Sequence, residues 1–241
     1  MKIGIISDLH SNIDSLKTVF EEFKRERIDK IICVGDVIGI GPYSKECVDF
    51  IIKNKEMFIS IIRGNHENYL IRGCPKNVHN RLLSDNEREM HSWNHKQLGE
   101  RQIEFIRSWN DRAELLINNV RIIVEHYPMN SEGKFKEFYK IPTLEQIHEL
   151  CKEKECDVFI FGHTHEDIYY EDENKKYINP GSLGCPIKNG AANFGILEIE
   201  NNTIKYKQCM KKYNVDKVIE EIRSLSYPMY EKMIDIFYRK N

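Results

Sequence analysis

The side chains best suited to chemistry in this chain are aspartates, histidines and one asparagine that directly follow short apolar runs. They lie in Asp8-Leu9-His10, Gly35-Asp36, Gly64-Asn65-His66-Glu67, Glu125-His126 and Gly162-His163-Thr164-His165. Mixed nitrogen and oxygen donors suit manganese, iron, zinc or nickel better than calcium. Two neighbouring divalent ions need a shared anionic ligand to offset their repulsion, and a carboxylate can bridge them. The sequence therefore indicates a site for two metal ions.

The elements that must position the first three motifs alternate between strands and helices. Apolar runs at residues 2–7, 30–34 and 58–62 predict buried strands, and each run ends at one of these motifs. A helix can begin at Ser11 or Asn12, and a second begins at Ser44. This alternation predicts parallel strands, whose carboxyl ends meet at the edge of the sheet where ligands bind.

The second half of the chain supplies the remaining motifs from two more strands. Residues 120–124 and 158–161 are the apolar runs that precede His126 and His163, and residues 143–154 predict a helix capped by Thr143. Short strands at residues 168–170, 176–179, 193–199 and 203–208 are separated by turn residues, which predicts antiparallel hairpins.

Two segments carry no metal motif. Residues 68–112 predict a helical insertion with helices at 84–97 and 99–109, which either forms a wall or lid for substrate or simply covers a sheet edge. Residues 213–241 predict a helical tail interrupted near Pro228. With these two additions, residues 1–241 are expected to form a single domain.

The composition limits the partners and the compartment. Lys and Arg total 36 against 38 for Asp and Glu, so the net charge of −2 indicates no preference for nucleic acid. Seven cysteines without paired spacing suit free thiols in a reducing compartment. No window approaches the roughly 20 apolar residues of a membrane span, and the apolar N-terminal stretch is too short for a signal peptide. A cytoplasmic protein with no membrane partner is expected.

In order and spacing, the motifs resemble the calcineurin-like metallophosphoesterase superfamily, which has D-x-H, G-D, G-N-H, H and G-H-x-H. The resemblance implies an α/β fold, a four-layer α-β-β-α sandwich of two mixed sheets flanked by helices. It also implies that Asp36 bridges two divalent ions. The remaining ligands implied are Asp8, His10 and His165 for one ion and Asn65, His126 and His163 for the other.

The resemblance further implies a mechanism in which two ions activate the water that attacks phosphorus. His66 is the implied catalytic residue, placed near the leaving-group oxygen as an acid or charge stabiliser, a role worth roughly 10² to 10⁴ in rate. The chain departs from the family pattern after His126, because Tyr127 and Pro128 stand where the superfamily usually has Gly. Residues 179–184 resemble the loop that follows the last metal-binding pair in bacterial members.

The residues after Asp36 bear on the substrate. Serine/threonine phosphatases carry an Arg there, in G-D-x-x-D-R-G, whereas residues 35–41 of this chain contain none. Because a phosphomonoester dianion gains more from a bidentate clamp, a small phosphodiester or dinucleotide polyphosphate is the expected substrate. The alternatives are a phosphomonoesterase or protein phosphatase gripped by Arg63 or Arg72, a repair-type nuclease, and an inactive scaffold like the retromer subunit. An oligomer formed through the C-terminal helices also remains open.

Overall fold

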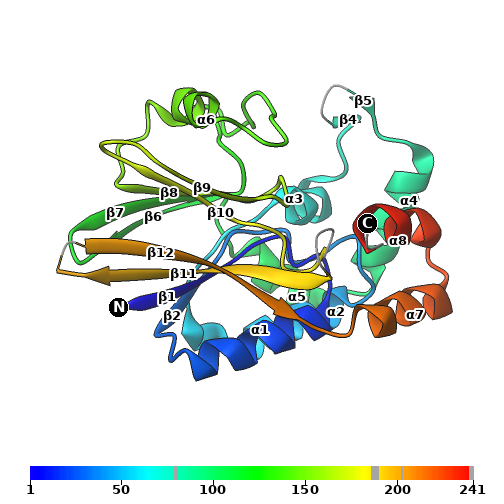
Figure 1. Cartoon of the computed structure of the whole chain (residues 1–241). Coiled ribbons are helices and arrows are strands. Elements are labelled where there is room, and N and C mark those ends of the chain that lie inside the picture. Colours follow the sequence, from blue (N-terminus) through cyan, green and yellow to red (C-terminus); the bar gives the residue numbers. More distant parts are fainter. Residues whose placement is uncertain (79–80, 186–189, 202, 239–241) are drawn as a thin grey trace.

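Two five-stranded sheets lie face to face in the computed structural model, which describes residues 1–78, 81–185, 190–201 and 203–238 (Figure 1). In spatial order, the first sheet consists of β12 (Thr203–Lys212), β11 (Ala191–Glu200), β1 (Lys2–Ile6), β2 (Lys30–Cys33) and β3 (Phe58–Ile61). The second consists of β6 (Arg112–Ile117), β7 (Val120–Glu125), β8 (Val158–Ile160), β10 (Lys176–Pro180) and β9 (Asp167–Glu171).

Both sheets are mixed. Strands β1, β2 and β3 are parallel, as are β7, β8 and β10. The pairs β9–β10 and β11–β12 are antiparallel, as the turn residues between them predicted. In both sheets, the parallel strands that precede the motifs run toward the same end of the molecule, which brings their terminal loops together.

Helices cover the outer face of each sheet. Helices α1 (Ile13–Arg25), α2 (Ser44–Lys53) and α5 (Glu100–Arg107) lie below the first sheet, and α6 (Leu144–Cys151) lies above the second (Figure 1). A short 3₁₀ turn at Lys55–Met57 leads into β3. The four-layer α-β-β-α sandwich is thereby confirmed.

The core is divided by these layers into aliphatic and aromatic parts. Branched side chains such as Ile5, Val34 and Ile160 fill the space between the sheets. Beneath the first sheet, α1 buries Leu16, Val19 and other apolar residues of one face against it. The Asn12 side chain accepts a hydrogen bond from the backbone N–H of Ser15 and so starts this helix, as its residue type predicted.

The remaining elements gather at the end of the sandwich where the motif loops lie. They are α3 (Asn65–Arg72), β4 (Asn77–Val78), β5 (Arg81–Leu82), α4 (Asp85–Lys96), α7 (Val215–Leu225) and α8 (Tyr230–Phe237). Helices α7 and α8 pack on Ile40 and Met90 through Val218, Ile222 and Met233. The C-terminal segment thus closes over loops from the first half of the chain (Figure 1).

The structure adds four elements that the sequence did not predict. Strand β6 is a sheet edge, with alternating exposed residues and with Leu116 70% exposed, so it lacks the apolar run of a buried strand. The two-residue strands β4 and β5 are too short to show a period. Helix α3 begins at Asn65, within the motif itself. Residues 68–112 therefore contain helices α4 and α5 but are not helical throughout.

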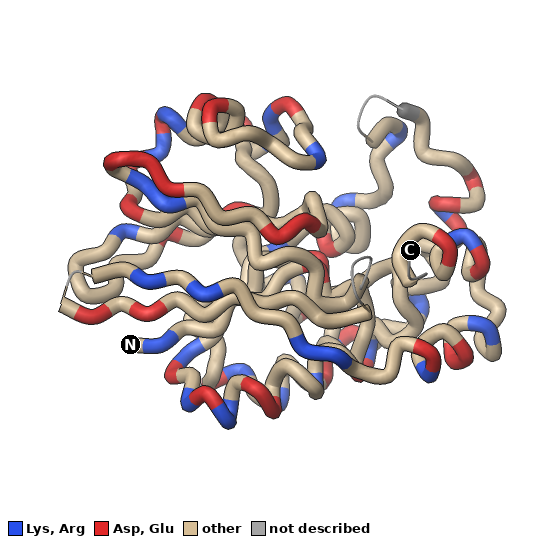
Figure 2. Tube along the Cα trace, in the orientation of Figure 1, with Lys and Arg blue, Asp and Glu red and all other residues tan. Residues whose placement is uncertain are grey.

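The charged residues are spread over the molecule, as the nearly balanced composition predicts. Lys and Arg alternate with Asp and Glu over the elements of both sheets and the outer helices (Figure 2). Within the residues described, every helix is too short or too polar to cross a bilayer.

Candidate metal centre

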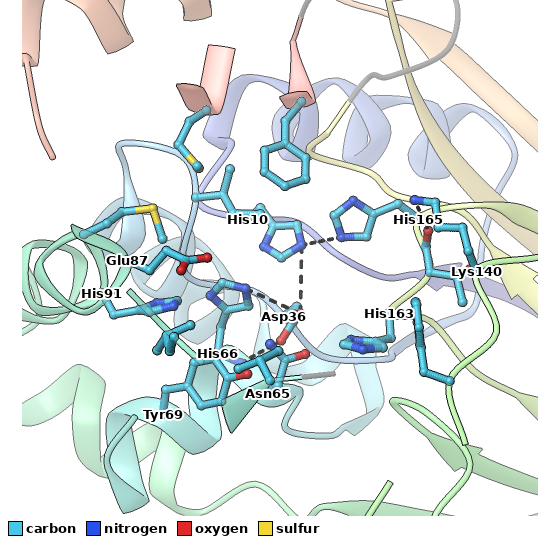
Figure 3. Close-up of a pocket in the computed structure, with 18 residues that line it drawn as sticks. His10, Asp36, Asn65, His66, Tyr69, Glu87, His91, Lys140, His163 and His165 are labelled. Atoms are coloured by element: carbon cyan, nitrogen blue, oxygen red, sulfur yellow. Dashed lines mark hydrogen bonds and ion pairs between the residues drawn. The ribbon is translucent and has the colours of Figure 1, made fainter. Parts of the chain in front are cut away.

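The seven predicted ligands and His66 come together at the carboxyl ends of β1, β2, β3, β7 and β8. His10, Asp36, Asn65, His66, His163 and His165 line a cavity of about 260 Å³ (Figure 3). Asp8 and His126 lie beneath its floor and are 0% and 1% exposed. The strand ends thus place side chains from five separate segments around one point.

One group of donors lies around His10 and His165. Their Nε2 atoms are 2.8 Å apart. Asp8 Oδ1 is 3.7 Å from His10 Nε2 and 3.5 Å from His165 Nε2, and Asp36 Oδ2 is 3.9 Å from His10 Nε2. Donors bound to one ion at about 2.1 Å stand roughly 3.0 to 3.4 Å apart. The four donor atoms therefore have nearly the spacing of one coordination sphere.

The second group lies on the other side of Asp36. His126 Nε2 is 3.1 Å from Asp36 Oδ2, and its Nδ1 lies 2.7 Å from the carbonyl oxygen of Val34. Ligand atoms of Asp36, His126 and His163 lie within 4.8 Å of one another. The departure from Gly at Tyr127 does not remove His126 from the group. The Tyr127 ring packs in the core beside α6, with its centroid 5.5 Å from that of His163.

The donor set fits divalent cations. Asn65 Oδ1 is buried and has no hydrogen-bond partner among the described residues, and the buried His126 Nε2 faces the Asp36 carboxylate at 3.1 Å. Leaving a buried polar atom unsatisfied costs about 1–3 kcal/mol, so these atoms fit a cation between them. Asp36 lies within 4.8 Å of ring nitrogens of His126 and His163 in one cluster and of His10 and His66 in another, so its position suits the bridge predicted for it.

Five of the predicted ligands have a left-handed backbone conformation. Asp8, His10, Asp36, His163 and His165 have φ values of 53°, 45°, 51°, 68° and 62°. Such conformations are uncommon outside glycine and cluster at functional sites.

Two glycines allow the close approach of the site's loops. A Cβ atom on Gly64 would lie 2.1 Å from Asp36 Oδ1, and one on Gly39 would lie 2.0 Å from His66 Nδ1. Any larger residue at either position would displace a ligand or the proposed catalytic side chain.

Glu67 holds the loop that carries Asp36 in place. Its carboxylate is fully buried and accepts four backbone hydrogen bonds, from the N–H groups of Gly64, Asp36, Val37 and Ile38, at 2.7 to 3.0 Å. Asp36 Oδ1 in turn accepts the backbone N–H of His66 at 2.9 Å. The Gly-Asn-His-Glu motif therefore fastens the loop after β2 to the start of α3.

The histidines of the site differ in the direction in which their surroundings shift the pKa. Burial lowers the pKa of His10 and of His165 to about 3, which leaves both rings neutral with a lone pair to donate. Burial also acts to lower the pKa of His126, but the carboxylates of Asp36 and Asp8 reverse this and raise it to about 9. Burial raises the pKa of Asp8 to about 7. A divalent cation would take the place of the proton on His126.

His66 stands at the edge of the metal ligands. Its Nε2 is 4.0 Å from Asp36 Oδ2, and its ring centroid is 4.9 Å from that of His10. Burial lowers its pKa, although Asp36 opposes the shift. The side chain keeps a 12% exposed surface on the cavity, so it can reach a bound molecule.

Several residues that sequence reasoning did not select also face the cavity. The ring centroid of His91 on α4 lies 5.0 Å from that of His66, with the two planes tilted by 58°, and that of Phe237 on α8 lies 5.7 Å from that of His165. Lys140 lines the wall beside His163 (Figure 3). The Cys185 thiol lies within 4.8 Å of His10 and His165, and its position after the 179–184 loop was the signal available for it.

The other candidates lie away from the ligands. His148 is exposed and pairs with Asp172 at 2.9 Å. His79 falls outside the described residues. Arg63 and Arg72 both bond to Asp111, at 3.1 and 2.6 Å, and neither lines the cavity.

The chain is similar to several proteins, including two that it matches over most of its length. It is 26% identical over 235 residues, 91% of each chain, to an uncharacterized protein of Methanocaldococcus jannaschii. A phosphodiesterase of the same organism is 25% identical over 83% of this chain and 94% of that one. A symmetrical bis(5'-nucleosyl)-tetraphosphatase of Psychromonas ingrahamii is 32% identical over 89 residues, 36% of this chain and 30% of that one.

A solved structure and a family model also match this chain. A metallophosphoesterase from Sphaerobacter thermophilus has the same fold, with a TM-score of 0.74, 21% identity and 98% of both chains covered. Residues 1–202 match the family model of the calcineurin-like phosphoesterase superfamily domain. The resemblance drawn from the motifs is confirmed, and the chain belongs to this superfamily of phosphoric ester hydrolases.

Proposed function

We propose that this chain is a metal-dependent phosphodiesterase that hydrolyses a small phosphodiester or a dinucleotide polyphosphate. One observation carries the choice of substrate: among the described residues that line the cavity over the predicted ligands there is a single lysine, Lys140, and no arginine. Arg63 and Arg72, the side chains that a phosphomonoesterase would use, are both engaged by Asp111. A singly charged diester needs no bidentate grip, whereas a monoester dianion gains from one.

Each residue of the centre has a role in this proposal. Asp8, His10 and His165 would hold one ion, Asn65, His126 and His163 the other, and Asp36 would bridge them. When bound, the two ions would supply Lewis-acid charge to the phosphoryl oxygens and lower the pKa of the attacking water.

His66 serves the leaving group. With its pKa lowered by burial, its ring is neutral near pH 7 and retains one N–H. That N–H donates a hydrogen bond to the departing oxygen, whose negative charge grows in the transition state.

The names of the relatives support the same class of substrate. One is a phosphodiesterase and another a symmetrical bis(5'-nucleosyl)-tetraphosphatase, so small phosphoesters of nucleotides suit the proposal. The intact ligand set argues against an inactive scaffold. The choice among manganese, iron, zinc and nickel, the cytoplasmic location and assembly through the C-terminal helices, where Leu225 and Ile236 are exposed, stay predictions.

The test is a comparison of substrates on one preparation. Protein purified without chelator is assayed with bis-p-nitrophenyl phosphate and with a phosphoserine peptide under the same metal. We expect kcat/KM to be higher for the diester. A tenfold preference for the phosphopeptide would overturn the proposal in favour of a phosphatase.

A further inference from the structure

A second cavity, of about 970 Å³, opens beside the metal centre. Asn65, Tyr69, Val78, Phe138 and His163 line both this cavity and the smaller one over the ligands, so the two are continuous. Its volume falls at the upper end of the roughly 300–1,000 Å³ of sites for small organic ligands. A molecule cleaved at the metals can therefore extend into it.

One wall of this cavity is built by the residue that departs from the family pattern. The Tyr127 hydroxyl donates to the carbonyl oxygen of Glu137 at 3.0 Å and accepts the backbone N–H of Tyr139 at 2.9 Å. The backbone N–H of Lys136 also bonds to the carbonyl oxygen of Pro128 at 2.9 Å. Tyr127 thus holds residues 135–139 in one conformation beside the metal ligand that precedes it.

The held segment presents aromatic rings. Phe135 and Phe138 are half-buried, and their ring centroids lie 5.2 and 5.4 Å from that of His163. Tyr69 of α3 lines the same cavity from the opposite wall. The flat faces of nucleobases stack on such rings whatever the base.

Polar groups stand at the same cavity. Asn68 lines it, and its amide Nδ2 donates to Asp111 Oδ1 at 3.1 Å. Lys134, at the turn of the loop, is an exposed cation on the rim, paired with Glu132 at 2.8 Å. A lysine on the rim suits the negative charge of a nucleotide.

We propose that this second cavity is a nucleotide subsite, in which the base of a nucleoside phosphate stacks against Phe135 while its phosphate reaches the metal centre. The inference rests on the proposed phosphodiesterase function and narrows its substrate to diesters or polyphosphates that bear a nucleoside. The base supplies binding energy remote from the reacting phosphorus.

The first experiment isolates the base. Binding of AMP and of ribose 5-phosphate to the metal-loaded protein is measured by calorimetry, because the two differ only in the base. We expect AMP to bind the wild type more tightly by roughly 5- to 150-fold, the contribution of stacking one base. Equal affinities would overturn the subsite.

The second experiment locates the base. Phe135→Leu keeps an apolar side chain against His163 but removes the ring, and it should bring the preference for AMP close to one. Phe105→Leu is the matched control, since Phe105 is a half-buried ring packed on Trp109, away from both cavities. An unchanged preference in Phe135→Leu would overturn the assignment. Metal content is measured in each variant to confirm that the centre is intact.

A third variant avoids the core altogether. Lys134→Glu changes a side chain that is 74% exposed, so folding is not at risk. It should weaken both ligands several-fold at low salt and less at high salt, because both carry the phosphate. No change at low salt would remove Lys134 from the subsite.

The outcomes separate the two proposals. Hydrolysis of bis-p-nitrophenyl phosphate without any preference for AMP would leave the phosphodiesterase standing and reject the subsite. Failure to hydrolyse any diester would reject the phosphodiesterase whatever the binding results.

Discussion

The metal centre differs in construction from the aromatic side chains that line the cavities beside it, such as Phe135 and Phe237. Together these side chains are called the wall. At the centre, ligands such as Asp8 and Asp36 are nearly or fully buried and held by backbone hydrogen bonds and left-handed backbone. On the wall, Phe135 and Phe237 are partly exposed side chains that lie on a loop and on the last helix. Each position in the centre requires one backbone conformation and one type of side chain. A position on the wall requires only an aromatic side chain of suitable size.

This difference predicts how the two regions respond to substitution. Replacing a ligand leaves buried polar partners unsatisfied, at about 1–3 kcal/mol each, and removes a bond to metal. Replacing a ring on the wall removes contact area that water can partly refill. The following experiments test this contrast from the largest effect to the smallest.

Asp36→Asn should abolish activity and lower the content of both metals, since Asp36 is the ligand proposed to bridge both ions. Metal analysis and an assay on bis-p-nitrophenyl phosphate check this expectation. His126→Ala is the contrast, because it should lose only the ion shared with Asn65 and His163. An Asp36→Asn protein that keeps two metals per chain would show that the bridge lies elsewhere.

His66→Gln should lower kcat by roughly 10² to 10⁴ while both metals stay bound, because His66 acts on the leaving group and not on the ions. Steady-state kinetics with metal analysis on the same sample make the comparison. If metal is lost in proportion to activity, His66 is a metal ligand and belongs to the metal centre.

Glu67→Gln should destabilise the metal-free protein by about 2–3 kcal/mol in urea unfolding. The Gln amide turns an NH₂ group toward two of the four backbone N–H groups that the carboxylate accepts. Glu114→Gln, at an exposed glutamate on β6, provides the matched control and should change little. Equal stability of the two variants would mean that the loop after β2 does not depend on this anchor.

Phe237→Leu should have the smallest effect, a roughly two- to tenfold rise in KM with a smaller change in kcat. Its ring lies 5.7 Å from that of His165 and lines the first cavity, but it holds neither a ligand nor the backbone of one. The check is steady-state kinetics on a small diester. Loss of bound metal in this variant would contradict the distinction between wall and centre.

Much of the centre could be predicted because its signals are local in sequence. A strand end followed by Asp, His or Asn needs only the apolar run before it, and parallel strands bring such ends to one edge. Seven ligands and His66 are grouped there, although their roles await the experiments above. The edge strand β6 and the short pair β4–β5 escaped prediction because half-exposed or two-residue strands carry no clear period.

The sequence by itself determined the residues that meet at the strand ends, since these follow from hydrophobic period and motif spacing. The same motifs resembled the family, and that resemblance implied the layered sandwich. Only the tertiary structure decided what surrounds those residues. His91, Cys185 and Phe237 reach the site from segments with no motif, because packing of α4, the 179–184 loop and α8 brings them there. It also decided the direction of the Tyr127 ring, which depends on the core beneath α6 and not on any neighbour in sequence.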